Sequence, residues 1–441
     1  MSDLFSPGSV GSPTADATSD RAFLEALLAA ESALVRARAV VGLTPADAAA
    51  AVTEVAADVG RFDVQDIASR AREGGNPVIP LVSALRSAVP AEAAAHVHRG
   101  ATSQDILDSA LMLLSARTLD LILTDLARTE RALARLASAH RDTVMPGRTL
   151  TQHAVPTTFG LKAAGWRSLV LDARDRLIDV RAGLPVQLGG AAGTLASFRT
   201  EGGCGRAGEA LTSAFAGELA LCAPALPWHT LRTPVADLAS ALALTAGAHG
   251  KMAADVLTLS RTEIAELSER EGGGSSSMPH KANPVRATLI AAAARRAPGL
   301  AATLHASLVA EDERPAGAWH AEWEPLRDLL RLTGGAARDG AELVEGLRVH
   351  TEAMRENLAL TGGLPASERA TTVLTSVLGS AAAAKELLTG SARRARAEGR
   401  PLAAVLAEEP ALRDFDVTAL MDPAQYTGYA GELTDRALER R

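Results

Sequence analysis

Aromatic residues and cysteines are scarce in this chain. Phenylalanine, tryptophan and tyrosine together make up 3% of the 441 residues, whereas hydrophobic residues make up 47%, so alanine and leucine must fill most of the core. Such a composition favours closely packed helices over strands, which are enriched in aromatic and β-branched residues. The only cysteines, Cys204 and Cys222, exclude a disulfide framework and a cysteine-rich metal cluster, and they suit the reducing cytoplasm.

Long apolar runs and an excess of positive charge are also missing. No stretch reaches the roughly 18 uncharged apolar residues expected of a membrane-spanning helix, and the first residues lack the basic start and apolar core of a signal peptide. The formal net charge of −7 argues against nucleic acid and anionic membranes as partners. We therefore expect a cytoplasmic protein in which local groups hold any anionic substrate.

One stretch, residues 272–284, combines conformational freedom with several ligand-binding groups. It reads Gly-Gly-Gly-Ser-Ser-Ser-Met-Pro-His-Lys-Ala-Asn-Pro, and helix-forming sequence flanks it on both sides. Its glycines permit backbone conformations that other residues avoid, so the segment before Ser275 should be mobile, and Pro284 can begin the next helix. Lys281 is one of only four lysines among 45 lysine and arginine residues, which favours a positional need for a compact ammonium group.

These residues resemble the signature Gly-Ser-Ser-x-Met-Pro-x-Lys-x-Asn-Pro of the fumarase/aspartase superfamily. The resemblance implies a loop that closes over the substrate, in which Ser275 exchanges a proton with the carbon next to a carboxylate. It also implies that Lys281 and Asn283 hold that carboxylate as negative charge builds up on it, with Ser276 and Met278 as further substrate contacts. The implied chemistry requires no metal and no organic cofactor, and the implied ligand is a small polycarboxylate.

A second motif, His-Arg-Gly-Ala-Thr-Ser-Gln-Asp at residues 98–105, predicts the start of a long helix. Thr102 can act as the N-cap with Asp105 three residues later, and apolar residues then recur at helical spacing. A helix N-terminus with two hydroxyl groups is also a ready site for an anion. The motif is similar to a second signature of the superfamily, which implies that Thr102 and Ser103 bind a substrate carboxylate. We include His98 as a further substrate contact.

A third motif covers residues 145–160 and is expected to head another long helix, through about Ala182. In elimination enzymes of the superfamily, a Gly-x-Thr-His segment supplies an acid or an orienting histidine. The matching position in this chain is Leu150. Gln152 and His153 follow closely in the sequence, and both are candidate substrate contacts.

The leucine at position 150 carries information about the leaving group. A departing amine or hydroxide needs a proton and hence a general acid, whereas a carboxylate or a nitrite leaves as a stable anion. The missing histidine therefore argues against amine elimination. It favours a leaving group, or a nucleophile in the reverse direction, that is already a stable anion.

Two arginines complete the candidate substrate contacts. Arg232 stands before the longest apolar periodic run, about residues 235–267, and it could clamp a carboxylate or lie in solvent. Arg314 belongs to the segment Glu-Arg-Pro-Ala-Gly-Ala-Trp-His-Ala-Glu-Trp at 313–323, which resembles the 3-carboxy-cis,cis-muconate cycloisomerase branch of the superfamily. The glycine-rich turn at 187–194 lacks the Gly-x-x-x-x-Gly-Lys pattern of a P-loop, so we expect it to permit close packing of helices around a substrate pocket.

The apolar periodicity predicts an all-α fold of three parts. We expect a small helical domain at 1–98, a central bundle of long helices at 99–350 and a small helical domain at 351–441. Within the first, a loose arm at 1–20 precedes a helix that Asp20 could cap. The resemblance implies a homotetramer whose active sites collect residues from several subunits, so that motifs far apart in the sequence meet across chains.

The branch resemblance implies a cycloisomerase that interconverts 3-carboxy-cis,cis-muconate and carboxymuconolactone, in the protocatechuate branch of aromatic breakdown. Ala282, Arg99, Leu150 and Thr233 depart from residues common in relatives and leave room for another substrate. The alternative is a lyase that releases a stable anion from a succinate derivative, for example nitrite from nitrosuccinate. Adenylosuccinate lyase fits less well because the acid histidine is missing. A catalytically silent structural member of the superfamily is the alternative outside the enzymes.

Overall fold

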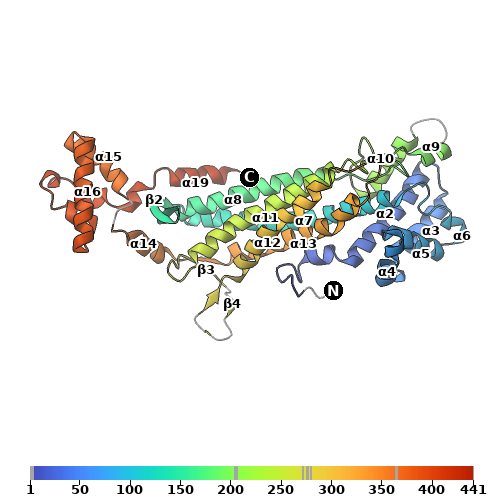
Figure 1. Ribbon diagram of the computed structural model, residues 1–441, viewed down its shortest axis with the longest axis horizontal. Helices are drawn as coiled ribbons and strands as arrows, with labels where there is room; N and C mark the ends of the chain where they lie inside the picture. The colour runs from blue at the N-terminus through green and yellow to red at the C-terminus, as the bar shows by residue number, and fades with distance from the viewer. Residues whose placement is uncertain are drawn as a thin grey trace. The chain divides into compact units, whose positions relative to one another are not determined.

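The computed structural model describes residues 4–202, 207–270, 273–274, 278, 281–362 and 366–440 (Figure 1). This part of the chain is mainly helical with a few short strands, which confirms the predicted all-α fold. The helices before residue 220 are α1 (Pro13–Ala17), α2 (Asp20–Val40), α3 (Ala46–Ala57), α4 (Val64–Gly74), α5 (Val78–Ala88), α6 (Ala91–Ala94), α7 (Ser103–Ala139), α8 (Phe159–Gly183), α9 (Ala196–Gly202) and α10 (Ala207–Leu219).

The second half of the chain continues in the same way. Its helices are α11 (Thr233–Leu259), α12 (Val285–Ala306), α13 (Ala318–Glu345), α14 (Thr351–Ala359), α15 (Ser367–Leu378), α16 (Ala381–Glu398), α17 (Leu402–Leu406), α18 (Val417–Leu420) and α19 (Ala430–Glu439). Three antiparallel strand pairs accompany them: β1 (Val144–Thr149) with β2 (Gln152–Thr158), β3 (Leu267–Glu269) with β6 (Leu347–Val349), and β4 (Gly273–Gly274) with β5 (Ala282–Asn283). Among the described helices, none has the length and apolar character needed to cross a membrane.

Contacts between residues group the chain into two compact units. Unit 1 comprises Met1–Ala127, Asp172–Gly250 and Leu289–Gly340, and unit 2 comprises Arg128–Leu171, Lys251–Thr288 and Ala341–Arg441. The boundaries fall inside or beside the five long helices α7, α8, α11, α12 and α13, so each of these helices contributes residues to both units. The division into domains at 98 and 350 remains a prediction.

Close helix packing in unit 1 depends on small residues. A Cβ atom at Gly250 of α11 would lie 2.4 Å from the Cβ atom of Ala294 in α12, and one at Gly340 of α13 would lie 2.3 Å from the ring of His249 in α11. Both distances are too short for any side chain larger than hydrogen. The abundance of alanine and glycine therefore lets α11 approach α12 and α13 closely, as the sequence composition suggested (Figure 1).

The N-terminal segment of unit 1 is anchored rather than loose. Arg331 of α13 donates hydrogen bonds to the hydroxyl and carbonyl oxygens of Thr18, at 2.9 and 2.8 Å. Arg338 of the same helix donates to the carbonyl oxygen of Gly8. The expected loose arm is thus wrong for residues 4–19. The cap prediction is wrong by one position, because Ser19 caps α2 through its hydroxyl and Asp20 is already helical.

The long helix expected after the motif at 145–160 is confirmed as α8, which ends at Gly183, but the structure differs from the prediction within that motif and at the end of α11. Residues 145–158 form the β1–β2 hairpin, and α8 begins only at Phe159. At the other boundary, α11 ends at Leu259 instead of continuing to about 267. After a turn at 260–264, Ala265 adopts a φ of 51°, which lies outside right-handed helical geometry, and the N–H of Glu266 bonds back to the carbonyl of Leu259. The chain then enters β3, which pairs with β6.

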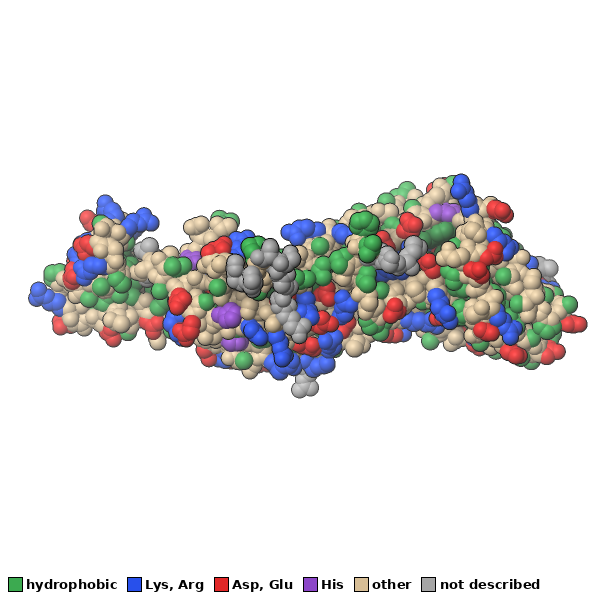
Figure 2. All heavy atoms as spheres, turned by 90° about the horizontal axis from the view of Figure 1, so that it is seen from below, with side chains coloured by type: hydrophobic (Ala, Val, Ile, Leu, Met, Phe, Trp, Pro, Cys, Tyr) green, Lys and Arg blue, Asp and Glu red, His purple; other side chains and the backbone are tan. Residues whose placement is uncertain are grey.

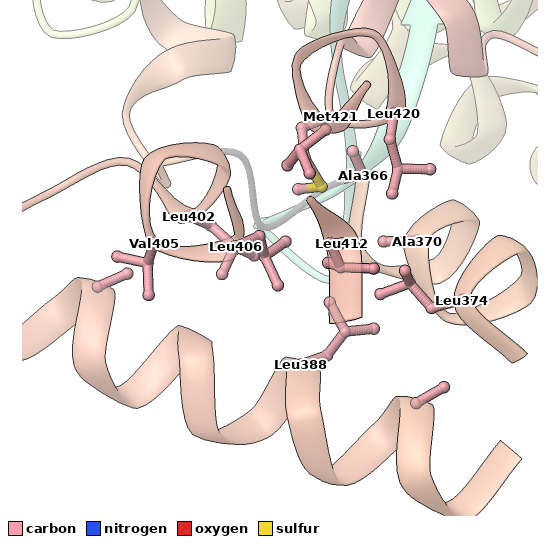
Figure 3. Packing of buried hydrophobic residues seen from close by; sticks show 13 residues of the cluster. Ala366, Ala370, Leu374, Leu388, Leu402, Val405, Leu406, Leu412, Leu420 and Met421 are labelled. Carbon is pink, nitrogen blue, oxygen red and sulfur yellow. The ribbon is translucent and has the colours of Figure 1, made fainter. Parts of the chain in front are cut away.

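The C-terminal part of unit 2 has an apolar core of its own (Figure 3). Leu374 of α15 and Leu388 of α16 are buried there and face the segment around Leu412. The remaining members come from α15 to α18 and their connections: Ala366, Ala370, Ala384, Ala395, Leu402, Val405, Leu406, Val417, Leu420 and Met421. This cluster explains why short helices after residue 360 are stable without long partners. On the molecular face in Figure 2, acidic and basic side chains of the described residues are interspersed.

We predict that Leu374→Ala destabilises this cluster by about 2–5 kcal/mol, because it leaves a cavity in a buried apolar site. Amide hydrogen exchange in α15 and α16 measures the loss of protection locally. Val377→Ala on the same helix is the matched control, because Val377 is 46% exposed and should change protection little. Equal effects of the two substitutions would contradict the assignment of Leu374 to the core.

Candidate functional site

The predicted site residues fall into two groups, one in each unit. Unit 1 holds His98, Thr102, Ser103, Arg232 and Arg314, and unit 2 holds Gln152, His153, Met278, Lys281 and Asn283. Ser275 and Ser276 lie outside the described residues.

The first group is centred on the start of α7. The backbone N–H of Thr102 donates to the Asp105 carboxylate at 3.0 Å, and the N–H of Asp105 donates to the carbonyl of Thr102. This confirms the predicted helix start and the pairing of these two residues. The hydroxyl groups of Thr102 and Ser103 make no hydrogen bond within the described chain and are partly exposed. They remain available at the positive end of a helix that is 37 residues long.

Asp105 ties the start of α7 to a glycine-rich turn. Its buried carboxylate also accepts the N–H groups of Gly189 and Gly190, each at 2.9 Å, and Nε2–H of His229 at 2.7 Å. A Cβ atom at Gly189 would come within 2.8 Å of the His229 ring, so only glycine permits this approach. The turn at 187–194 therefore packs tightly against the helix start, and two of its amides bind Asp105. His229 was not predicted, and no motif in the sequence marks it.

Arg314 is held beside the same helix start. Its Nε donates to the side-chain oxygen of Gln104 at 3.1 Å, and Nη2 donates to the carbonyl of Ala191 at 3.2 Å. Gln104 in turn donates to the carbonyl of His229 at 2.9 Å. A guanidinium group has five N–H donors, so the described contacts leave three of them for an anion. The structure therefore places Arg314 near Thr102 and Ser103 through its contact with Gln104. Arg314 and Ser103 are 211 residues apart in the sequence.

His98 reaches this neighbourhood through an unusual backbone conformation. Its φ is 58°, a left-handed value that non-glycine residues rarely adopt. Nδ1 of His98 lies 2.6 Å from Oε1 of Glu31 in α2, and the two side chains are 15% and 0% exposed. Burial alone lowers the pKa of His98, but the charge and hydrogen bond of Glu31 outweigh it and raise the pKa above the ordinary value. His98 therefore takes up a proton more readily than a free histidine.

Arg232 is placed differently from either expectation. Its side chain is 1% exposed, so the solvated alternative is wrong. Its guanidinium donates to both carboxylate oxygens of Asp108, to both of Glu322 and to the carbonyl of Trp228. All five donors are used, which leaves none for a substrate carboxylate. Arg232 instead neutralises two buried acids inside unit 1.

In unit 2, the β1–β2 hairpin presents a strained tip. Thr149 pairs with Gln152, so Leu150 and Thr151 form a two-residue turn, with φ values of 48° and 72°. Positive φ at both positions is the pattern of a type I′ turn, which normally carries Asn-Gly. The Leu150 side chain is 96% exposed. Gln152 is also exposed and donates to the hydroxyl of Thr151.

Next to the hairpin tip, Arg148 of β1 is fixed by an ion pair with the buried Glu266. Arg148 binds both oxygens of Glu266, at 2.5 and 3.0 Å, and Asn357 donates to Glu266 at 2.8 Å. His153 lies opposite Arg148 in the strand register. Burial, followed by the positive charge of Arg148, lowers the pKa of His153, and its buried Nδ1 has no hydrogen-bond partner in the described part of the chain. The lowered pKa of His153 favours the neutral imidazole, which can accept a hydrogen bond.

The serine-rich stretch leaves and re-enters the described structure through the β4–β5 pair. Gly273 pairs with Asn283, and Gly274 pairs with Ala282. Just beyond β5, the carboxylate of Glu269 accepts the N–H groups of Arg286 and Ala287 at the start of α12. These contacts fix the positions from which the stretch departs and returns. The side chain of Lys281 is exposed beside β5 and that of Met278 is 41% exposed.

No group of three or more potential His, Cys, Asp or Glu metal ligands occurs among the residues that the structure describes. The donors at the start of α7 in unit 1 are suited to holding an anion, and so, separately, is the exposed ammonium group of Lys281 in unit 2.

The chain is similar to known proteins over nearly its whole length. Residues 10–299 match a family model described as lyase. The chain is 50% identical to a nitrosuccinate lyase from Streptomyces davaonensis, covering 99% of this chain and 94% of the relative, and 43% identical to a 3-carboxy-cis,cis-muconate cycloisomerase from Pseudomonas aeruginosa, covering 99% and 95%. The crystal structure of 3-carboxy-cis,cis-muconate lactonizing enzyme from Pseudomonas putida matches with a TM-score of 0.93 and 40% identity, over 99% of this chain and 98% of that one.

We predict that Arg232→Met lowers the free energy of unfolding by about 3–5 kcal/mol, because it leaves Asp108 and Glu322 buried without a counter-charge. Denaturant unfolding measures the change. Arg181→Met is the matched control in unit 1, since Arg181 pairs with Asp120 at the surface and should contribute about 1 kcal/mol or less. Normal stability together with a raised KM would instead make Arg232 a substrate ligand.

Proposed function

Because the chain is an enzyme of the lyase family, and so of the fumarase/aspartase superfamily, we propose that it eliminates nitrite from nitrosuccinate to give fumarate. The sequence motifs placed a cycloisomerase first and this elimination second. We reverse that order because the chain shares 50% identity with a nitrosuccinate lyase and 43% with a cycloisomerase, over the same 99% of its length.

The observation that carries the proposal is Leu150. It stands 96% exposed at the tip of the hairpin, at the position where the superfamily motif has a histidine that can act as an acid. The isobutyl side chain of leucine carries no acidic proton and cannot protonate a leaving group. Nitrite leaves as a stable anion and needs no proton, so its departure is compatible with leucine at this place, whereas the departure of ammonia or hydroxide is not.

In the proposed reaction, Ser275 removes a proton from the methylene carbon of nitrosuccinate next to its carboxylate. The electron pair of that C–H bond becomes the new double bond as the C–N bond breaks, and nitrite leaves with the electrons of the C–N bond. Negative charge collects transiently on the carboxylate beside the reacting carbon. Lys281 and Asn283 hold that charge, and the donors at the start of α7 hold the other carboxylate.

The donors at the start of α7 fit this second role by their geometry. The hydroxyls of Thr102 and Ser103 lie at a helix N-terminus, and Arg314 is fixed beside them with donors to spare. His98, Gln152, His153, Ser276 and Met278 remain the further substrate contacts of the proposal. Arg232 is no longer among them, because its donors are occupied within unit 1.

We also propose that the active enzyme is a homotetramer in which several subunits contribute to each active site. Large apolar side chains are exposed in the single chain, among them Leu150 at 96%, Val309 at 87% and Leu226 at 66%. Contact with other copies would remove such surfaces from water. A cytoplasmic location likewise remains part of the proposal.

The second candidate is the interconversion of 3-carboxy-cis,cis-muconate and its lactone. The segment at 313–323 favours it: Trp319 and Trp323 stack edge to face with centroids 4.9 Å apart, and Trp319 Nε1 donates to Asp108 at 2.9 Å. Here the substrate's own carboxylate takes the place of nitrite as a stable anion. The same Leu150 is therefore compatible with this reaction.

A substrate panel separates these possibilities. We expect the purified protein to release nitrite and fumarate from nitrosuccinate, measured by diazotisation and by ultraviolet absorbance, with much slower turnover of carboxymuconate and adenylosuccinate. Faster loss of the diene absorbance of carboxymuconate would make the second candidate correct. Turnover of none of the three by a folded protein would favour the silent structural alternative.

We predict that Ser275→Ala lowers kcat by about 10²–10⁴-fold, the usual effect of removing a positioned proton-transfer group. Size-exclusion chromatography should show an unchanged assembly. The neighbouring Ser277→Ala is the control, because no role in the reaction is assigned to Ser277, and it should keep near-normal kcat. Near-normal turnover by Ser275→Ala would remove Ser275 from the proposed role.

A further inference from the structure

A buried carboxylate that the proposed mechanism does not use lies beneath His98. Glu31 is in the middle of α2, and its side chain is 0% exposed. Oε1 lies 2.6 Å from Nδ1 of His98, and Oε2 has no hydrogen-bond partner in the described part of the chain. Burying a carboxylate with so few partners costs folding free energy. Its one strong contact, to His98, therefore calls for an explanation.

The position of His98 is strongly determined by its surroundings. A left-handed φ at a non-glycine residue is disfavoured by about 1–3 kcal/mol and persists only where neighbouring contacts hold it. His98 has a φ of 58°, and it is followed two residues later by Gly100 at 83°. The chain then reaches Thr102 and the start of α7. The hydrogen bond to Glu31 is thus one of the contacts that hold this turn next to the anion-binding donors.

Three charged groups act on the imidazole from three different helices. Burial lowers the pKa of His98, whereas Glu31 of α2 and, more weakly, Asp105 of α7 raise it, and Arg86 of α5 lowers it. The net effect is a raised pKa. The ion pair of His98 and Glu31 therefore stabilises the folded state fully when the pH is below about 6.5, the ordinary pKa of histidine. This stabilisation is lost as the pH rises through the raised pKa of His98 in the folded protein.

Proton occupancy decides what the other ring nitrogen can bind. Nδ1–H donates to Glu31 in both the neutral and the charged ring. In the neutral ring, Nε2 then carries a lone pair and repels a carboxylate. In the charged ring, Nε2 becomes a donor with a positive charge behind it. Nε2 of His98 makes no hydrogen bond within the described residues, so it is open to a ligand.

We propose that Glu31 is a positioning residue that keeps His98 as an imidazolium, with Nε2–H directed to a carboxylate of the substrate. This inference rests on the proposed function, since it adds a pH-dependent donor to the carboxylate site at the start of α7. It assigns Glu31 a role through His98 and without direct contact to the substrate. It also predicts that the enzyme binds its dicarboxylate more weakly once His98 loses its proton.

The test compares Glu31→Gln with the wild type, with Glu31→Asp as a partial rescue. Glu25→Gln is the matched control on the same helix, because Glu25 is at the surface and pairs with Arg21. The first readout is an NMR titration of the His98 imidazole, identified by the signal missing in His98→Asn. We expect the pKa of His98 to fall below the ordinary value of about 6.5 in Glu31→Gln, to recover in part in Glu31→Asp and to be unchanged in Glu25→Gln.

The second readout is the pH dependence of substrate use. In the wild type, we expect KM for nitrosuccinate to increase as the pH is raised above the pKa of His98. In Glu31→Gln the same rise begins at lower pH, with KM at pH 7 higher by about 10-fold or more and kcat changed little. Unchanged His98 titration in Glu31→Gln overturns the inference. A lowered pKa of His98 with an unchanged KM profile also overturns it, because His98 then does not face the substrate.

Failure of the proposed function would look different. Fumarate serves as a dicarboxylate probe that binds without reacting. Suppose that the wild type releases no nitrite but binds fumarate more weakly when the pH exceeds the pKa of His98. The role of Glu31 would then stand, and the assigned reaction would be wrong. If fumarate bound equally at all pH values, or did not bind, the inference would fall as well.

Discussion

The carboxylate of Asp105 is the contact on which the first group of candidate site residues depends. It joins the backbone of Thr102, the amides of Gly189 and Gly190 and the ring of His229 in one buried set of hydrogen bonds. These groups come from three regions of the chain, because Gly189 lies 84 residues and His229 lies 124 residues after Asp105. Without this acceptor, three buried donors would lose their partner, and the start of α7 would no longer be fixed against the glycine-rich turn. Arg314 and Gln104 extend the same set toward the exposed hydroxyls.

In the second group of candidate site residues, in unit 2, the position of most interest is both exposed and strained. Leu150 and Thr151 occupy left-handed conformations, and Leu150 is almost fully exposed. The ion pair of Arg148 with the buried Glu266 holds the end of β1 directly before this unfavourable turn. An apolar tip beside a neutral His153 suits a reaction in which nothing has to protonate the departing group. The geometry of this hairpin and the chemistry of a stable leaving anion are thus consistent with each other.

Much of the fold could be predicted from sequence, because helical periodicity and helix start signals are local. The pairing of Thr102 with Asp105, the long helix that follows and the all-α class are confirmed. The β1–β2 hairpin was missed because its turn, Leu150-Thr151, lacks the Asn-Gly that normally announces such a turn. Arg232 was misjudged because its partners, Asp108 and Glu322, lie 124 and 90 residues away, and no periodic pattern reports such pairings. Glu31 and His229 were missed for the same reason.

The tip of the hairpin also bears on any attempt to make this enzyme more heat-resistant. Replacing Leu150-Thr151 by Asn-Gly would relieve the left-handed strain, and standard stabilisation strategies would choose that change early. The same change would put a polar amide and a bare backbone where the chain now presents a large apolar side chain. If Leu150 sets the leaving-group preference as proposed, a screen that selects only for melting temperature would enrich variants in which that preference has changed.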